Sequence, residues 1–304
     1  MDRLLFGDNQ FFGINHMSEE RARAQAMRFQ RTDAIMDVLA AARDAGIRTF
    51  MCTTHDRIAE VTARVRADPA AWDGFAFYPC MPYAHKYANA VTEHGMMGAL
   101  REFMPRDGLL ATALTGTKAL ATKEVDGIAR MLIDMELRMF EGVPAPVVFI
   151  QNVFTDLLLG MGFTRALRIF DDHVRERHGA EPAYITMNMP LLLDALEREG
   201  IERPIVCSNI NKIGFRMAGG QDAYLDALRS GRVRAIAMSV FASGAIPADE
   251  AIHWIAELPG VESIVFGASS AANIRGTRAL VDRYMGPDAP VAAAQAGAGH
   301  EARA

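Results

Sequence analysis

A histidine and an aspartate stand directly after two short apolar runs of this sequence, and both can exchange protons. His55 follows the run at 47–53, and Asp8 ends the first such run. Imidazole titrates near neutral pH, and a carboxylate such as Asp8 or Asp56 can orient it. We therefore predict acid/base catalysis by His55 and Asp8. The alternative is that His55 is a solvated loop side chain and that Asp8 caps a turn at Asn9.

Lysine is rare enough in this chain for its positions to carry information. There are only four lysines, and Lys86 and Lys212 fall in predicted loops after apolar runs. A desolvated lysine has a lowered pKa and can form a Schiff base, whereas a charged lysine binds anions. We include Lys212 among the catalytic candidates, with anion binding or plain surface exposure as its alternatives.

Amide, hydroxyl and other polar side chains follow most of the remaining apolar runs. This arrangement is typical of a polar pocket above a packed core, and it predicts a substrate that forms hydrogen bonds. The alternative for each asparagine is local capping of the backbone, which is a common use of this residue in loops. The predicted substrate-binding residues are Asn9, Asp56, Tyr83, His85, Asn152, Asn188, Ser208, Asn209 and Asn211.

A stretch of small residues joins the last apolar run to a helix and could hold a phosphate. Free N–H groups at a helix start bind anions, and barrels often hold phosphate at this point. The alternative is simple helix capping by Ser269 or Ser270. Ser243 and Gly244, after the seventh apolar run, could complete the same site. The predicted phosphate- or cofactor-binding residues are Ser243, Gly244, Gly267, Ser269, Ser270 and Asn273.

Metal and disulfide chemistry have little support in the spacing of the possible ligands. His16, His55 and His85 could join Asp8 at a metal ion, but no two of these have a spacing such as HxH or HExxH. We therefore predict no metal site. The three cysteines are an odd number at wide spacing with no CxxC pair, which predicts reduced, buried thiols.

The elements that would position these side chains alternate between short β-branched or aromatic runs and longer segments with helical apolar spacing. This alternation predicts repeated βα units on a parallel sheet, closed as a TIM (β/α)8 barrel. In such a barrel the strand ends carry the catalytic groups. The eight predicted strands are Leu4 to Asp8, Ile47 to Thr53, Gly74 to Cys80, Pro146 to Asn152, Ala183 to Asn188, Pro204 to Asn209, Arg234 to Val240 and Glu262 to Gly267.

Helix boundaries and the domain limits follow from local punctuation. Thr32 is expected to cap the first helix, and Gly46 and Gly200 to close the helices before them. We predict one barrel domain over residues 1–286, with a helical insertion between the third and fourth strands at about 83–144. A ninth strand at 109–114 is the alternative within that insertion. Residues 287–304 lack an apolar face and are predicted to be a disordered tail.

Charge and hydropathy exclude several classes of partner. The net charge is −5 with no dense basic run, which argues against nucleic-acid binding. No apolar run is long enough to span a bilayer, and the start of the chain lacks a signal-peptide pattern. We expect a cytoplasmic protein that acts on a small molecule, while the oligomeric state is left open.

From Ala183 onward the order of features resembles the C-terminal half of the aldo-keto reductases. A strand ending Met187-Asn188 precedes a short leucine-rich helix and the strand at 205–209, much as that family's Ser-Asn strand precedes its glutamine strand. The stretch at 267–270 with Asn273 is similar to the family's final strand and cofactor-phosphate helix. Asp44-Ala45-Gly46-Ile47 is also similar to a helix-to-strand junction of the family. The resemblance implies the same barrel and a possible NADP cofactor.

The catalytic tetrad of that family, an Asp, a Tyr, a Lys and a His, is changed in this chain. Cys52 aligns with the Asp and Arg57 with the Tyr; the third strand has no lysine, and Gln151-Asn152 replaces the histidine. Without an acid at the carbonyl oxygen, hydride transfer loses roughly 10²–10⁴-fold of general-acid catalysis.

The first hypothesis is therefore an isomerase or lyase that applies acid/base chemistry to a polar, phosphorylated or unphosphorylated substrate. The second is an NAD(P)-dependent oxidoreductase with a relocated proton donor such as His55 or Tyr83. The third is a ligand-binding barrel without catalysis.

Overall fold

The computed structural model describes residues 1–13, 19–83 and 118–286, and this part of the chain forms a closed barrel of parallel strands. The strands follow one another around the barrel in chain order, and β8 pairs with β1 to close it. All eight predicted strands are present, which confirms the (β/α)8 class. Their bounds are β1 (Leu4–Phe6), β2 (Thr49–Thr53), β3 (Ala76–Met81), β4 (Val147–Ile150), β5 (Glu181–Thr186), β6 (Ile205–Asn209), β7 (Arg234–Met238) and β8 (Val261–Phe266).

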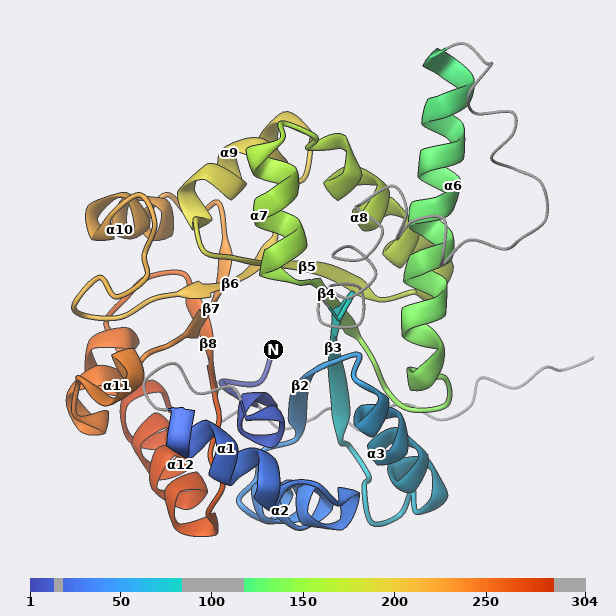
Figure 1. The fold of residues 1–304 in the computed structure, drawn as a ribbon. Helices are drawn as coiled ribbons and strands as arrows, with labels where there is room; N and C mark the ends of the chain where they lie inside the picture. Colours follow the sequence, from blue (N-terminus) through green and yellow to red (C-terminus); the bar gives the residue numbers. More distant parts are fainter. Residues whose placement is uncertain (14–18, 84–117, 287–304) are drawn as a thin grey trace, which may run out of the picture.

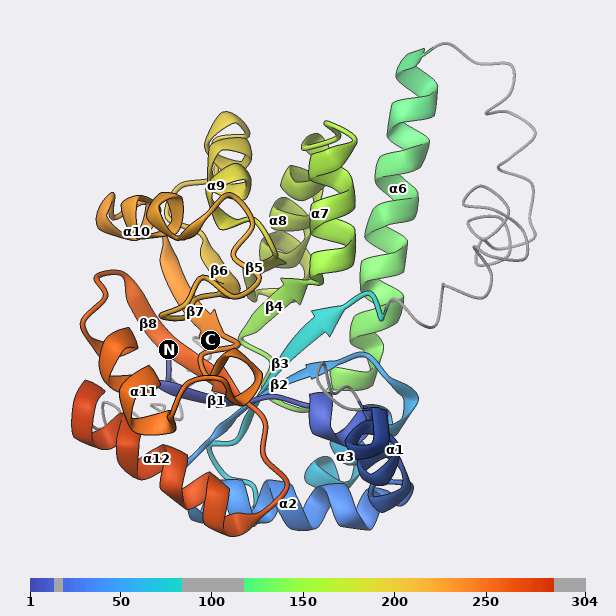
Figure 2. The same ribbon diagram turned by 60° about the vertical axis from the view of Figure 1, so that its left-hand side comes forward.

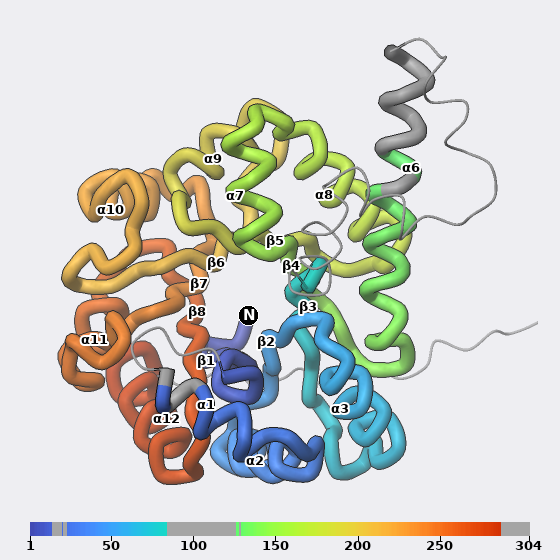
Figure 3. Tube along the Cα trace, in the orientation of Figure 1, coloured from blue at the N-terminus to red at the C-terminus, as the bar shows by residue number. Residues whose placement is uncertain are grey.

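Helices surround the strands on the outside of the barrel (Figure 1). The chain passes once around this ring from β1 to α12, so each strand is followed by helical structure before the next one begins (Figure 3). The α-helices are α1 (Glu19–Arg28), α2 (Thr32–Asp44), α3 (Asp56–Ala67), α6 (Lys118–Leu137), α7 (Asn152–Gly160), α8 (Arg165–His178), α9 (Met189–Arg198), α10 (Gln221–Arg229), α11 (Ala248–Ala256) and α12 (Ala271–Met285), and the short 3-10 helices are η1 (Asn9–Phe12), η2 (Arg138–Phe140) and η3 (Ala242–Gly244).

The core has two layers because side chains of a strand alternate between its two faces. Met51 and Tyr78 belong to a cluster of buried side chains that fills the barrel interior. Phe50 and Phe77, one position away in each strand, belong to a second cluster between the strands and the helices. Their rings meet edge to face at 6.1 Å. The nearly continuous apolar runs of the sequence thus reflect strands that are buried on both faces.

Five strands, β1, β4, β5, β7 and β8, end one or two residues earlier than predicted. For β7 and β5 the reason lies in the loop that follows. β7 stops at Met238 because Ser239 has a left-handed backbone (φ 56), which cannot continue a ladder. β5 runs from Glu181 to Thr186 and not from Ala183 to Asn188. Asn188 instead caps α9, where its side chain accepts a hydrogen bond from the Leu191 N–H.

Helix punctuation was predicted correctly at the glycines and wrongly at one cap. Gly46 and Gly200 both have positive φ angles, 80° and 74°, two residues past the ends of α2 and α9. Thr32, by contrast, is the first residue of α2 and not its cap, because Arg31 takes the extended cap position. The Thr32 hydroxyl donates a hydrogen bond to Glu60 on the next helix instead.

The predicted insertion contains at least one long helix. The described part of this insertion forms α6 and the short η2 that follows it. The alternative strand at 109–114 and the predicted tail at 287–304 lie outside the described residues. Within the described ranges, no helix is both long and apolar enough to cross a membrane.

The segment after β1 is held down by aromatic packing. Phe11 of η1 is fully buried and meets Phe29 edge to face at 4.9 Å and Phe50 at 6.1 Å. α1, which lies between η1 and α2, was not predicted from the sequence. The buried Phe11 ring fixes η1 beside the carboxyl end of β1, and this position determines where its neighbours Asp8 and Phe12 lie.

Candidate active site at the barrel mouth

Three segments that follow β1, β2 and β3 converge on His55 at the carboxyl ends of the strands, here called the mouth. His55 is the cap residue of α3, and its Nδ1 accepts the Arg57 backbone N–H at 3.0 Å. Phe12 of η1 stacks on the imidazole at 4.2 Å between ring centres, and Tyr83 meets its edge at 5.1 Å. Since Nδ1 accepts a hydrogen bond, the neutral imidazole carries its proton on Nε2.

Asp8 is a buried carboxyl between β1 and β2. It is 6% exposed and accepts hydrogen bonds from both the backbone N–H and the hydroxyl of Thr53, each at 2.7 Å. Burial raises the pKa of Asp8, and the two hydrogen bonds from Thr53 offset only part of that effect. Asp8 therefore retains a proton to higher pH than an exposed aspartate does.

Tyr83 is half-buried, and both burial and the charges around it affect the pKa of its phenol. Burial raises the pKa of its phenol, the negative charge of Asp8 raises it further, and Arg57 acts in the opposite direction. Tyr83 thus remains a hydroxyl donor at neutral pH. Its backbone N–H donates to Glu136 Oε2 at 3.4 Å. Glu136 comes from α6, is 1% exposed and also accepts the Thr54 hydroxyl.

Glu136 was not predicted from the sequence, because it lies within a helix and far along the chain from the strands it supports. It links α6 to the segments after β2 and β3 through the two hydrogen bonds from Thr54 and Tyr83. A buried carboxylate at such a junction fixes the loops that carry His55 and Tyr83. A lone glutamate in a predicted helix offers no sequence signal for this role.

Gln10 and Gly267 meet where β1 and β8 close the barrel. Gln10 is 5% exposed, and its Nε2 donates to the Gly7 carbonyl at 2.8 Å. Its Oε1 is buried and has no hydrogen-bond partner among the described residues. A Cβ on Gly267 would lie 2.2 Å from that oxygen, so a larger residue there would displace the Gln10 amide. The rim thus holds a buried acceptor next to a predicted phosphate-binding residue.

The predicted phosphate-binding residues lie in two neighbouring loops, after β7 and after β8. The first loop contains three non-glycine residues with left-handed backbones, at φ 56 for Ser239, 43 for Ala242 and 59 for Ser243. Such strain is typical of ligand-binding loops. In the second loop, Ser270 caps α12 by accepting the Asn273 N–H at 3.3 Å, as the capping alternative expected. Gly244 and Ser269 lie in the first and second loop, respectively.

On β6 and in the loop just after it, the predicted substrate-binding residues form contacts within the protein. The buried Ser208 hydroxyl donates to the Thr186 carbonyl at 2.7 Å. Asn209 donates to the Arg216 carbonyl at 3.0 Å, and Asn211 bonds both ends of its amide to the Phe215 backbone. These contacts correspond to the local backbone use of asparagine that the sequence analysis left open.

The remaining predicted site residues lie on the surface, at helix starts or outside the described ranges. Lys212 forms a surface ion pair with Glu250 at 2.7 Å, with both side chains nearly half exposed. Asn152 and Asp56 begin α7 and α3. Asn9 is exposed at the start of η1. His16, His85 and Lys86 are outside the described residues.

A cleft of about 390 Å³ lies at the loops after β5 and β6, lined by Met187, Gly214, Arg216, Met217 and Ala218. The backbone N–H of Met187 donates to Asp156 at 3.0 Å. Arg216 is exposed, has a left-handed backbone (φ 56) and places its guanidinium 5.3 Å from the Phe215 ring. The cleft therefore offers a positive charge to an anionic group. Among many arginines, nothing in the sequence singled out Arg216.

The cysteines are buried thiols, as predicted. Burial raises the pKa of Cys52, Cys80 and Cys207, so none is a thiolate at neutral pH. Cys80 and Cys207 belong to the interior of the barrel, whereas Cys52 belongs to the layer between strands and helices. Alternation along β2 therefore makes Thr53, and not Cys52, the residue that faces the mouth.

Comparison with known proteins identifies the fold of this chain through solved structures and not through sequence. No protein-family model matches the chain, and no curated protein matches it. Solved structures do: a presumed aldo-keto reductase from Pseudomonas aeruginosa is 12% identical, with a TM-score of 0.58 over 93% of this chain and 90% of that one. An aldo/keto reductase from Brucella melitensis is 12% identical, with a TM-score of 0.54 over 92% and 88%.

An aldose reductase from Giardia lamblia is similar to the same extent, at 12% identity and a TM-score of 0.52 over 93% of this chain and 90% of that one. The chain therefore has the barrel fold of the aldo-keto reductases, which confirms the resemblance noted in its sequence. At this level of identity the likeness describes the fold, because one barrel supports many unrelated reactions.

Proposed function

We propose that this protein is a nicotinamide-dependent oxidoreductase that interconverts a carbonyl and an alcohol at the barrel mouth. The observation that supports this most is the contact of His55 with Tyr83 beside the buried Asp8. Reduction of a carbonyl needs a proton donor at the oxygen that gains charge. The Tyr83 hydroxyl is that donor, and the Nε2–H of His55 is a second one.

The rest of the mouth is compatible with a bound dinucleotide. The unpartnered Gln10 Oε1 at the rim can accept a hydrogen bond from an amide N–H, if the loop beside it opens to admit a ligand. Ser243 and Ser269 lie in the adjacent loops, which would hold the phosphates. Bound nicotinamide would supply the hydride. The chain's own part is to orient the carbonyl and to exchange its proton through Tyr83.

A second function uses the same side chains without a nucleotide. The raised pKa of the buried Asp8 is an observation that suits a general acid, and this would allow isomerisation or elimination on a polar substrate. Nucleotide binding distinguishes the two functions, because only the first one requires it.

The test combines nucleotide titration with two variants. Purified protein is titrated with NADPH and NADH, and nucleotide oxidation is followed with a panel of aldehydes and ketones. Tyr83→Phe and His55→Asn should each lower kcat by about tenfold or more while nucleotide affinity changes little. Asparagine is chosen at position 55 because it is also a good helix cap.

The matched control is Tyr284→Phe, which removes a hydroxyl that bonds Asp249 on the outer helices. This variant should keep full activity. If neither nucleotide binds, the proposed oxidoreductase function is wrong. Turnover of a polar substrate without nucleotide would then support the second function. Full activity in Tyr83→Phe would exclude Tyr83 as the proton donor.

A further inference from the structure

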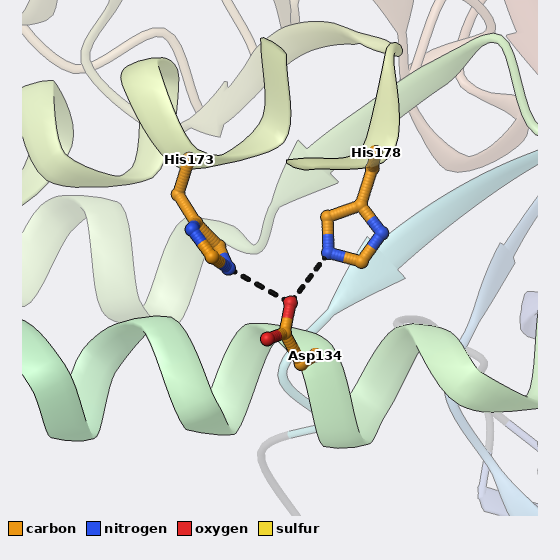
Figure 4. A group of neighbouring side chains, drawn as sticks. All are labelled: Asp134, His173 and His178. Carbon is orange, nitrogen blue, oxygen red and sulfur yellow. Dashed lines mark hydrogen bonds and ion pairs between the residues drawn. The ribbon is translucent and has the colours of Figure 1, made fainter. Parts of the chain in front are cut away.

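Two histidines and an aspartate come together on the outside of the barrel, between α6 and α8. His173 and His178 both belong to α8 and point toward Asp134 on α6 (Figure 4). Their Nε2 atoms lie 2.8 and 2.7 Å from the same oxygen, Asp134 Oδ1. The three candidate ligand atoms all lie within 4.8 Å of one another.

The composition of this cluster matches the preferences of one kind of cation. Neutral imidazole nitrogens and a carboxylate are ligands of Zn²⁺, whereas Ca²⁺ and Mg²⁺ take oxygen ligands. Zinc bonds of roughly 2.0–2.1 Å in a tetrahedral arrangement separate neighbouring ligand atoms by about 3.3 Å. Asp134 is partly exposed, so its carboxylate can move outward by the required fraction of an ångström, and the two imidazole nitrogens, within 4.8 Å of each other, adjust to the same ion. A water molecule would complete the coordination.

We propose that Asp134, His173 and His178 form a zinc site that links α6 to α8. The site would be remote from the mouth, because His178 ends the helix that leads into the amino end of β5. It therefore stands independently of the proposed reaction. Spacing in the sequence could not suggest it, since Asp134 is 39 and 44 residues from the two histidines.

Arg130 is the group that opposes metal binding. Its guanidinium lies 3.3 Å from Nδ1 of His173 and 3.8 Å from the Glu176 carboxylate. When Nε2 binds the metal, the neutral ring carries its proton on Nδ1 and no longer accepts from Arg130. Arg130 must then turn toward Glu176. Replacing Arg130 by glutamine removes the positive charge and supplies an acceptor for the Nδ1–H, so this variant should bind zinc more tightly.

The experiment is calorimetric titration of the chelator-treated full chain with ZnCl₂, together with its melting temperature. We expect one ion per chain with a Kd on the order of micromolar or below, and a melting temperature raised by several degrees. Millimolar MgCl₂ should cause no such shift. Cobalt, added in place of zinc, should show the intense visible absorption of a tetrahedral site.

Single variants identify the ligands. His178→Gln and Asp134→Asn should each weaken zinc binding by about tenfold or more, while Arg130→Gln strengthens it. His178 is used because its side chain is more exposed than that of His173, so the variant should fold. The control is His253→Gln, a surface histidine 3.5 Å from the single carboxylate of Glu257.

The proposal is overturned if the wild type binds zinc no better than His178→Gln does. It is also overturned if zinc binds but leaves the melting temperature unchanged. In the first case, Asp134 serves only as a shared acceptor for the two imidazole N–H groups.

Discussion

At the scale of single residues, the mouth is organised around groups whose ionisation is controlled by burial. Asp8 is the clearest case, because it is enclosed beside Thr53 and burial is the largest influence on its pKa. Two hydrogen bonds from Thr53 lower the pKa of Asp8, but they offset only part of the effect of burial. The negative charge of Asp8 in turn favours the protonated form of Tyr83. The proton transfer proposed for this site thus depends on the burial of Asp8.

The raised pKa of Asp8 makes a prediction about stability and pH. Its pKa is higher in the folded than in the unfolded chain, so stability is lost as pH rises from the ordinary aspartate range through the raised value. Asp8→Asn keeps an acceptor for Thr53 but cannot ionise. The free energy of unfolding of this variant, measured with urea across that pH range, should increase relative to wild type as pH rises.

Asp56→Asn is the control for this series, because Asp56 is exposed at the start of α3. Its stability relative to wild type should vary much less over the same range. A constant difference between Asp8→Asn and wild type would mean that Asp8 ionises as readily in the folded protein as in the unfolded chain.

At the scale of elements, glycines with left-handed backbones set the angle at which one element leads into the next. Gly46 follows α2 with φ 80, and Gly260 precedes β8 with φ 76. Their surroundings differ. Nothing lies within 4 Å of a Cβ built on Gly46, whereas one on Gly260 would lie 3.2 Å from the Leu228 carbonyl oxygen.

Alanine at these two positions should therefore have unequal costs. Gly46→Ala should lower the free energy of unfolding by about 1–2 kcal/mol, which is the cost of the left-handed backbone alone. Gly260→Ala should lower it further, because backbone atoms of another element must also move. Urea denaturation of the two variants checks the order, and equal losses would show that the loop before β8 relaxes freely.

The packing of α2 against α3 explains why the cap of α2 was predicted wrongly. The apolar stripe of α2 and its closing Gly46 were visible in the sequence, whereas its cap was assigned to Thr32 because threonine is a common cap residue. The structure uses the Thr32 hydroxyl to bond Glu60 on α3. A contact between neighbouring helices thus replaced a local one.

At the scale of the whole molecule, the two ends of the barrel are built differently. The end opposite the mouth carries charged side chains that link strands. Arg234 of β7 pairs with Glu181 of β5 at 2.7 Å and with Glu262 of β8 at 3.2 Å. Burial, together with the charges of Asp2 and Glu181, raises the pKa of Tyr78 to about 12. The proposed zinc site lies between α6 and α8, two of the helices on the outside of the barrel (Figure 2).

Arg234 should therefore matter more than an ordinary surface arginine. Arg234→Met leaves two carboxylates without their shared cation and should lower the free energy of unfolding by about 1–2 kcal/mol, which is less than for a fully buried pair because all three groups are partly exposed. The control, Arg229→Met, breaks an exposed pair with Asp226 and should cost at most about 0.5 kcal/mol. Equal effects in urea denaturation would contradict a special role of Arg234.

The sequence by itself determined the strand count, the closed barrel and the placement of His55, Asp8 and Tyr83 at strand ends. These follow from local patterns, because strands buried on both faces must be apolar and their polar successors must lie at one rim. Only the tertiary structure decided which groups meet. Glu136 reaches Tyr83 from α6, and Asp134 reaches two histidines from the same helix, because helix packing brings together residues whose separation along the chain carries no signal.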